Sequence, residues 1–155
     1  MILKDVPSFW QIFTTKPTFK VASLDVGTKK IGIATYNSIV QVVTPLPIFT
    51  RLGDNSDVGK LIDILKENKI EGLIIGMPLT LNGDLGKNSN NVTKLAERIL
   101  NLHDIPIIFV DERFTTKLAN SMLKQIDVSR KKRNQVDDQL AAMILLEDFL
   151  KTKPA

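Results

Sequence analysis

The chain has no cysteine and only one histidine, His103. The absence of cysteine excludes disulfide bonds, thiolate zinc sites and a cysteine nucleophile. A single histidine cannot form a histidine metal cluster, and its place after a predicted helix is typical of a surface residue. Any bound metal would therefore need oxygen ligands, which favours Mg²⁺ or Mn²⁺.

Long apolar runs are absent too. No segment approaches the roughly 20 apolar residues of a membrane span, and residues 1–20 lack the basic start, apolar centre and cleavage site of a secretory signal. We therefore expect a soluble protein of the cytoplasm. With 155 residues, 43% of them hydrophobic, the chain has the size of one globular domain with a full core.

The charge balance is mildly basic, with 21 lysines and arginines against 17 aspartates and glutamates and a pI near 9.3. This bias is compatible with a polyanionic partner, but it is also common in ordinary cytosolic proteins. The positions of the charges are therefore more informative than their sum.

The pattern at residues 21–34 is an apolar run that ends in Asp25, a Gly-Thr-Lys-Lys turn and a second apolar run. It predicts two neighbouring strands joined by a tight turn. A carboxylate at a strand tip is held by the sheet yet reaches solvent, metal or phosphate. From this stretch alone, a functional aspartate and a solvated hairpin are equally good interpretations.

The predicted fold class is α/β, with a mixed five-stranded sheet and helices on both faces. Three antiparallel strands precede a parallel strand-helix-strand unit, and the strands are predicted at 19–26, 30–37, 39–48, 70–76 and 106–110. Helices are predicted at 61–68, at 88–102, from Thr115 or Thr116, and from 136 to about 151, after a basic linker at 129–133.

Residues 1–19 form an N-terminal arm before the predicted domain at 20–151. The arm holds an apolar segment, Phe9 to Phe13, between Pro7 and Pro17. This segment packs either on its own domain or on a partner, and the sequence leaves both alternatives open.

Three acidic positions stand at the ends of buried elements. Asp25 ends the first strand, Glu112 and its neighbour Asp111 follow the fifth strand, and Asp138 opens the last helix. Converging carboxylates repel one another and lose hydration, so such a cluster needs a cation. A pair of divalent ions meets this need and supports phosphodiester hydrolysis. Taken singly, each acid is typical of a capping or surface residue.

Basic residues surround these acids in the sequence. A basic rim around an acidic centre suits an enzyme that acts on a phosphate backbone, although a run of cations is by default a solvated surface. The candidate nucleic-acid-binding residues are Lys29, Lys30, Lys87, Arg113, Arg130, Lys131, Lys132 and Arg133.

Five ordered motifs between about residues 20 and 150 resemble the YqgF family of RNase H-like proteins, described as Holliday junction resolvases and as pre-16S ribosomal RNA nucleases. The motifs are LDVGTKKIGIA at 24–34, GMPLTLNGDLG at 76–86, DERFTT at 111–116, VSRKKRNQVDD at 128–138, and the DxxAA pattern that starts at 138. The resemblance covers the predicted domain and leaves out the N-terminal arm.

The resemblance implies an RNase H-like fold and cleavage of phosphodiester bonds with Mg²⁺ or Mn²⁺, two ions being expected. It implies that Asp25, Glu112 and Asp138 are the catalytic residues and metal ligands, with Asp111 as a helper. Asp138 is preferred to Asp137 because of its spacing to the two alanines at 141–142. The chain departs from the family in having Lys29-Lys30 where Lys-Arg is frequent.

Four functions are compatible with these residues to different degrees. The first is a nuclease that processes the 5′ end of pre-16S rRNA, and the alternative is a Holliday junction resolvase, which would need two active sites and hence a dimer. A nucleotide-binding module of the actin kind ranks lower, because such proteins need two domains around a cleft. A non-catalytic RNA-binding assembly factor also ranks lower, because an unused acidic cluster costs stability.

Overall fold

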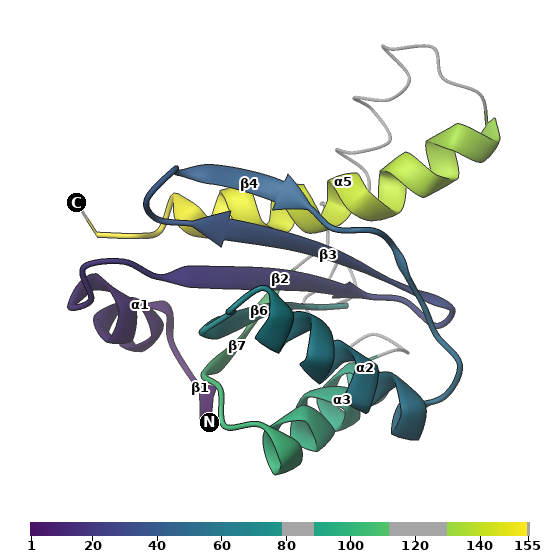
Figure 1. Ribbon diagram of the computed structural model, residues 1–155, viewed down its shortest axis with the longest axis horizontal. Coiled ribbons are helices and arrows are strands. Elements are labelled where there is room, and N and C mark those ends of the chain that lie inside the picture. Colours follow the sequence, from purple (N-terminus) through teal and green to yellow (C-terminus); the bar gives the residue numbers. More distant parts are fainter. Residues whose placement is uncertain (79–88, 112–129, 155) are drawn as a thin grey trace.

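The apolar runs pair into one mixed β-sheet (Figure 1). The computed structural model describes residues 1–78, 89–111 and 130–154, with the backbone alone for residues 130–138. Its strands are β1 (Ile2–Leu3), β2 (Lys20–Val26), β3 (Lys30–Asn37), β4 (Val42–Pro45), β5 (Phe49–Thr50), β6 (Gly72–Met77) and β7 (Ile107–Asp111). Its helices are α1 (Val6–Thr14), α2 (Asp54–Glu67), α3 (Ser89–Leu102) and α5 (Arg130–Leu150).

Strand β2 lies inside the sheet, whose order is β1-β7-β6-β2-β3-β4, with β5 paired to β3. β2 is antiparallel to β3 and parallel to β6, and β6 is parallel to β7. The parallel strands β2, β6 and β7 therefore end at one edge of the sheet, at Val26, Met77 and Asp111. We call this edge the carboxyl edge.

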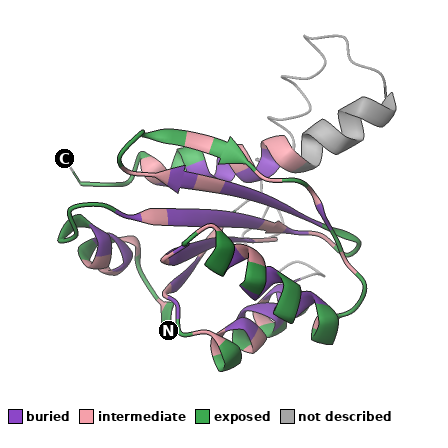
Figure 2. Ribbon diagram, in the orientation of Figure 1, coloured by how far each residue is buried: buried purple, intermediate pink, exposed green. Residues whose placement is uncertain are grey.

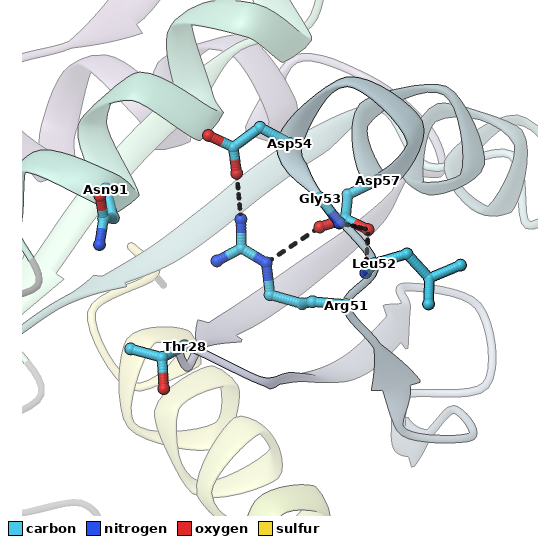
Figure 3. Close-up of a pocket in the computed structure, with 7 residues that line it drawn as sticks. All are labelled: Thr28, Arg51, Leu52, Gly53, Asp54, Asp57 and Asn91. Atoms are coloured by element: carbon cyan, nitrogen blue, oxygen red, sulfur yellow. Dashed lines mark hydrogen bonds and ion pairs between the residues drawn. The ribbon is translucent and has the colours of Figure 1, made fainter.

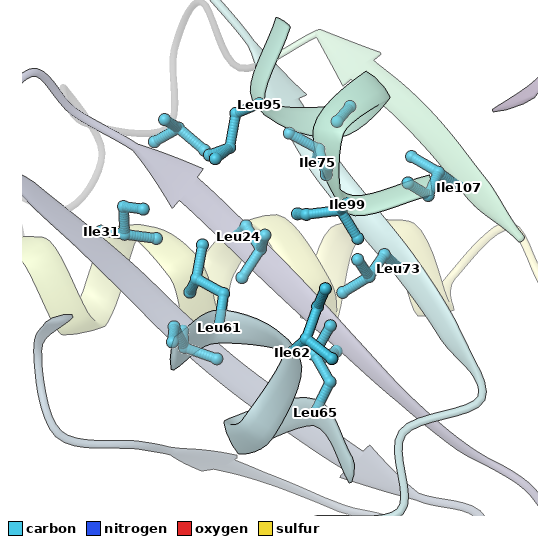
Figure 4. Packing of buried hydrophobic residues seen from close by; sticks show 14 of the residues in the cluster. Leu24, Ile31, Leu61, Ile62, Leu65, Leu73, Ile75, Leu95, Ile99 and Ile107 are labelled. Atoms are coloured by element: carbon cyan, nitrogen blue, oxygen red, sulfur yellow. The ribbon is translucent and has the colours of Figure 1, made fainter. Parts of the chain in front are cut away.

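Each face of the sheet carries its own apolar core, because alternate residues of a strand point to opposite faces. Helices α2 and α3 cover the face that carries Leu24 and Ile75 (Figure 4). Helices α1 and α5 cover the face that carries Val21 and Ile108. The helices turn their exposed sides outward, while most of β2 and β3 is buried (Figure 2). The α/β class with helices on both faces is thus confirmed.

The sheet has seven strands among the described residues rather than the predicted five. The predicted strand at 39–48 begins later than expected and is divided in two. It begins later because Asn37 to Gln41 form a turn in which the Asn37 side chain accepts the N–H of Ile39 at 2.8 Å. The chain then continues as the short strands β4 and β5, separated by Pro47, which has no N–H for a sheet ladder. The additional strand β1 comes from the N-terminal arm and pairs with β7.

The rest of the N-terminal arm packs on its own domain. Phe9, Trp10 and Phe13 of α1 are fully buried. The Trp10 ring stacks on Phe149 of α5 with 5.1 Å between ring centroids, and its Nε1 donates to Thr152 Oγ1 at 2.9 Å. The aromatic segment thus joins the two ends of the chain instead of standing free for a partner.

Two helix boundaries differ from the prediction. Helix α2 starts at Asp54, seven residues before the first residue of its predicted apolar pattern, because a polar first turn gives no periodic signal. Helix α5 starts at Arg130, so the predicted basic linker at 129–133 is wrong from residue 130 onward. Lysine and arginine are good helix formers, but they carry no apolar pattern. The helix predicted from Thr115 or Thr116 lies outside the described residues.

Within the described ranges, the structure has no helix whose length and apolar character would let it cross a membrane.

Gly72 provides a test of the packing of α1 on the sheet. A Cβ at this position would lie 2.5 Å from Cζ of the buried Phe13 ring. We expect Gly72→Ala to lower the free energy of unfolding by about 1–3 kcal/mol in urea denaturation, because the ring cannot move without displacing the core. The control is Gly59→Ala on the exposed face of α2, where nothing lies within 4 Å. This change should raise stability by about 0.5–1 kcal/mol, and equal effects of the two changes would contradict the packing.

Candidate active site

Asp25 is the penultimate residue of β2. It pairs with Gly32 of β3 at the carboxyl edge. It is partly buried. Alternation along the strand places Asp25 on the same face as Ser23, two residues earlier. Ser23 is buried and donates to the carbonyl oxygen of Ala142 in α5 at 2.7 Å. Asp25 therefore lies on the face of the sheet that α5 covers.

Helix α5 brings the position of Asp138 to the same end of β2. The helix runs antiparallel to β2 (Figure 1), with its buried Ala141 and Ala142 against the sheet. Asp138 precedes Ala142 by one helical turn, which is about 6 Å along the axis. Asp25 follows Ser23 by about 7 Å along the strand in the same direction. The backbones of Asp25 and Asp138 thus both lie near the carboxyl edge.

The other acidic positions are only partly described. Asp111 ends β7 at the carboxyl edge and is exposed. It lies two strands from β2, a backbone separation of about 10 Å. Glu112 lies outside the described residues, as do Lys87 and Arg113. The described side chains include no group of three acidic or histidine residues that could hold a metal ion, so the triad of Asp25, Glu112 and Asp138 stays a prediction.

Basic residues extend beyond Asp25 at this edge. Lys29 lies in the turn between β2 and β3, Lys30 opens β3, and both are exposed. The segment from Arg130 to Arg133 forms the first turn of α5, which projects past the sheet (Figure 1). The structure thus places these two basic segments at the end of the sheet that carries Asp25.

The turn that follows Asp25 is closed tightly. The N–H of Gly27 donates to the carbonyl oxygen of Lys30 at 2.8 Å. A Cβ at Gly27 would lie 2.8 Å from that same oxygen. Only glycine fits this turn without moving the backbone that carries the candidate site.

An ion-pair cluster that the sequence analysis did not predict holds this turn. It is formed by Arg51, Asp54 and Asp57 (Figure 3). Arg51 Nη1 donates to the Gly27 carbonyl at 3.1 Å, and the backbone N–H of Arg51 donates to the Lys29 carbonyl at 2.9 Å. Arg51 Nε donates to Asp57 at 3.1 Å. We call these three residues the Arg51 cluster. It anchors the turn to the start of α2.

Asp57 is the buried partner in this cluster, with no exposed surface. Burial alone would raise its pKa, but hydrogen bonds from the Leu52 N–H, from Arg51 and from the Gly53 N–H hold the pKa below its ordinary value near 3.8. The signal of this cluster in the sequence is a cation, Arg51, followed by acids three and six residues later. The cluster borders a cavity of about 340 Å³.

Comparison with known proteins identifies the family. A family model described as "RuvX: Holliday junction resolvase" matches residues 19–152. The chain belongs to the RuvX family. This assignment confirms the resemblance to YqgF proteins and makes the chain a member of a family of nucleases, which hydrolyse phosphodiester bonds.

Curated RuvX relatives match this chain over nearly its whole length. A protein of Rickettsia africae (strain ESF-5), named "Putative pre-16S rRNA nuclease", is 36% identical over 150 residues, covering 97% of this chain and 96% of its own. A protein of the same name from Rickettsia typhi (strain ATCC VR-144 / Wilmington) is 34% identical, covering 97% and 95%. The N-terminal arm is therefore largely included in these matches.

Solved structures share the fold at low identity. The fowlpox virus resolvase in complex with Holliday junction DNA has a TM-score of 0.54 and 15% identity, covering 86% of this chain and 98% of its own. RuvC of T. thermophilus with a Holliday junction substrate has a TM-score of 0.50 and 14% identity, covering 86% and 94%. At this identity the likeness shows the fold alone, and it confirms the RNase H-like fold class.

The Arg51 cluster generates a prediction on acid stability. Because the pKa of Asp57 is depressed in the folded state, its stabilising contribution is complete above the unfolded pKa of about 3.9 and is lost as the pH falls below that value. We expect Asp57→Asn to lower the free energy of unfolding at pH 7 by about 3 kcal/mol, since the largely buried Arg51 loses the buried one of its two carboxylate partners. The stability of the variant should also depend less on pH between 5 and 3, measured by urea denaturation.

The matched control is Asp63→Asn, an exposed aspartate of the same helix. Its effect should stay within about 0.5 kcal/mol. Equal losses in the two variants would show that the Arg51 cluster does not stabilise the fold.

Proposed function

We propose that this RuvX protein is a divalent-metal-dependent nuclease with its active site at the carboxyl edge, formed by Asp25, Glu112 and Asp138. The observation that carries the proposal is the contact of Ser23 with Ala142. This contact fixes α5 along β2, so that the backbone of Asp138 reaches the end of the strand that carries Asp25. Membership of a nuclease family supports the same assignment.

The residues at this edge fit an oxygen-liganded divalent ion. Asp25 is a partly exposed carboxylate on a rigid strand, the chain has no cysteine, and His103 lies after α3, away from the carboxyl edge. Asp25, Glu112 and Asp138 would hold Mg²⁺ or Mn²⁺, in a pair of ions, with Asp111 as a further ligand at the same edge. When bound, such ions supply Lewis-acid stabilisation of the charge that develops at the phosphate.

The protein's own cations would position the nucleic acid. Lys29 and Lys30 lie beyond Asp25 at the turn between β2 and β3, so they can hold backbone phosphates next to the scissile bond. The basic first turn of α5, residues 130–133, would contact the backbone further along the strand. The remaining predicted contacts, Lys87 and Arg113, follow β6 and β7 in the sequence. Such binding weakens as the salt concentration rises, because each contact releases counterions.

The proposed substrate is the 5′ end of pre-16S rRNA in the cytoplasm. The support is the name carried by relatives that are 36% identical over 97% of this chain. The similarity extends over 96% of the relative's own length rather than over one part of it.

A second candidate substrate is four-way junction DNA. It is favoured by the description of the family model and by the solved fold neighbours with Holliday junction substrates. Symmetric resolution of a junction needs two active sites, so this activity would require a dimer. Native mass measurement distinguishes the two candidates, because a monomer would count against junction resolution.

The test is cleavage of a precursor RNA fragment and of a four-way DNA junction, with Mg²⁺ or Mn²⁺. We expect metal-dependent cutting of the RNA, reduced at least about 100-fold by Asp25→Asn, because neutralising the carboxylate removes a central ligand. The matched control, Asp148→Asn, changes an exposed aspartate at the far end of α5 and should leave the rate unchanged.

The two substrates separate the candidate functions. Cutting of the junction alone would replace the RNA substrate with the second candidate. Unchanged RNA cleavage by Asp25→Asn would show that the active site lies elsewhere.

A further inference from the structure

A second cavity lies next to the candidate active site, on the face of the sheet covered by α5. It has a volume of about 330 Å³ and is lined by Lys30, Ile48, Thr50 and Gln139. Lys30 stands two residues along β3 from Gly32, the pairing partner of Asp25. Gln139 follows Asp138 in α5. Lys30, which lines the cavity, is therefore displaced by about 7 Å along the strand direction from the level of Asp25.

Gln139 presents a hydrogen-bond acceptor of defined orientation. Its Nε2 donates to the carbonyl oxygen of Leu46 at 3.1 Å. An amide with its NH₂ group on a carbonyl must direct its oxygen elsewhere, because two carbonyl oxygens would repel each other. Gln139 is partly buried and lines the cavity, so its side chain is held there with Oε1 directed away from the Leu46 carbonyl.

The other wall comes from the connection between β4 and β5. Leu46 donates its N–H to the Ile33 carbonyl at 2.9 Å, which fixes this connection on the sheet. Ile48 adds an apolar surface, and Thr50 adds a hydroxyl group. Thr50 pairs with Lys30 across β5 and β3, so the hydroxyl and the cation stand side by side.

We propose that this cavity binds the ribose of a nucleotide next to the scissile phosphate and selects RNA by its 2′-hydroxyl. A 2′-hydroxyl can both donate and accept. It would donate to Gln139 Oε1 and accept from Thr50 Oγ1, while Lys30 binds the adjoining phosphate. Deoxyribose would leave the Gln139 oxygen without a partner in a partly buried site, which disfavours DNA. This inference rests on the proposed nuclease function and names the substrate class of its site.

The test is the ratio of affinities for an RNA oligonucleotide and for DNA of the same sequence. Affinities are measured by fluorescence anisotropy in the Asp25→Asn background, so that cleavage does not compete with binding. We expect RNA to bind more tightly, and Gln139→Leu to reduce the preference about tenfold by weakening RNA binding. Single 2′-deoxy substitutions in the RNA should reveal one position whose effect disappears in the variant, because the two changes remove the same contact.

Two further variants keep the test decisive. Thr50→Val changes an exposed residue without loss of volume and should also reduce the preference, so it serves if Gln139→Leu lowers the melting temperature. Gln11→Leu on the exposed face of α1 is the matched control and should leave the preference unchanged.

The outcomes separate the inference from the proposed function. If Gln139→Leu and Thr50→Val weaken RNA and DNA binding equally, the cavity does not read the ribose, while cleavage that depends on Asp25 still stands. If wild type fails to cleave but the variants lose the RNA preference, the ribose site stands and the nuclease assignment fails.

Discussion

The close approach of α5 to the centre of the sheet is the constraint on which the rest of the site depends. A helix packs this closely only where its side chains are small, and α5 presents Ala141 and Ala142 there. The buried Ser23 hydroxyl donates to the Ala142 carbonyl at 2.7 Å. Leaving a buried hydroxyl unpaired costs free energy, so this bond fixes which residues of α5 lie beside which residues of β2. Both Asp138 and Gln139 take their positions from that register.

The Arg51 cluster fixes the opposite side of the candidate site. Arg51 binds two carbonyl oxygens of the turn after Asp25 and two acids at the start of α2. A buried ion pair adds little net stability against an apolar alternative, but it holds a defined geometry. A nuclease needs its carboxylates positioned before the substrate arrives, because misplacement by about 1 Å costs rate. The cluster therefore holds the turn in one geometry, even though apolar residues at the same positions would stabilise the fold as much.

Local patterns could be predicted from the sequence, whereas contacts between distant residues could not. Asp25 was found because an apolar run, an aspartate and a glycine turn are neighbours in the chain. Arg51 and Gln139 were missed because their partners Gly27 and Leu46 lie 24 and 93 residues away. The segment from Arg130 to Arg133 has the sequence pattern of a linker although it is helical, since a helical turn without apolar residues shows no periodicity. The late start of β4 depended on the Asn37 turn, whose side-chain hydrogen bond the apolar pattern concealed.

The central claim is that Asp25 and Asp138, which lie far apart in the sequence, belong to one metal site at the carboxyl edge. The most direct measurement is Mn²⁺ binding by electron paramagnetic resonance for wild type, Asp25→Asn, Asp138→Asn and the double variant. The account predicts that each single change weakens binding at least about tenfold and that the double change is less than additive, because both carboxylates serve the same site. Unchanged Mn²⁺ affinity in either single variant, or fully additive losses in the double variant, would contradict it.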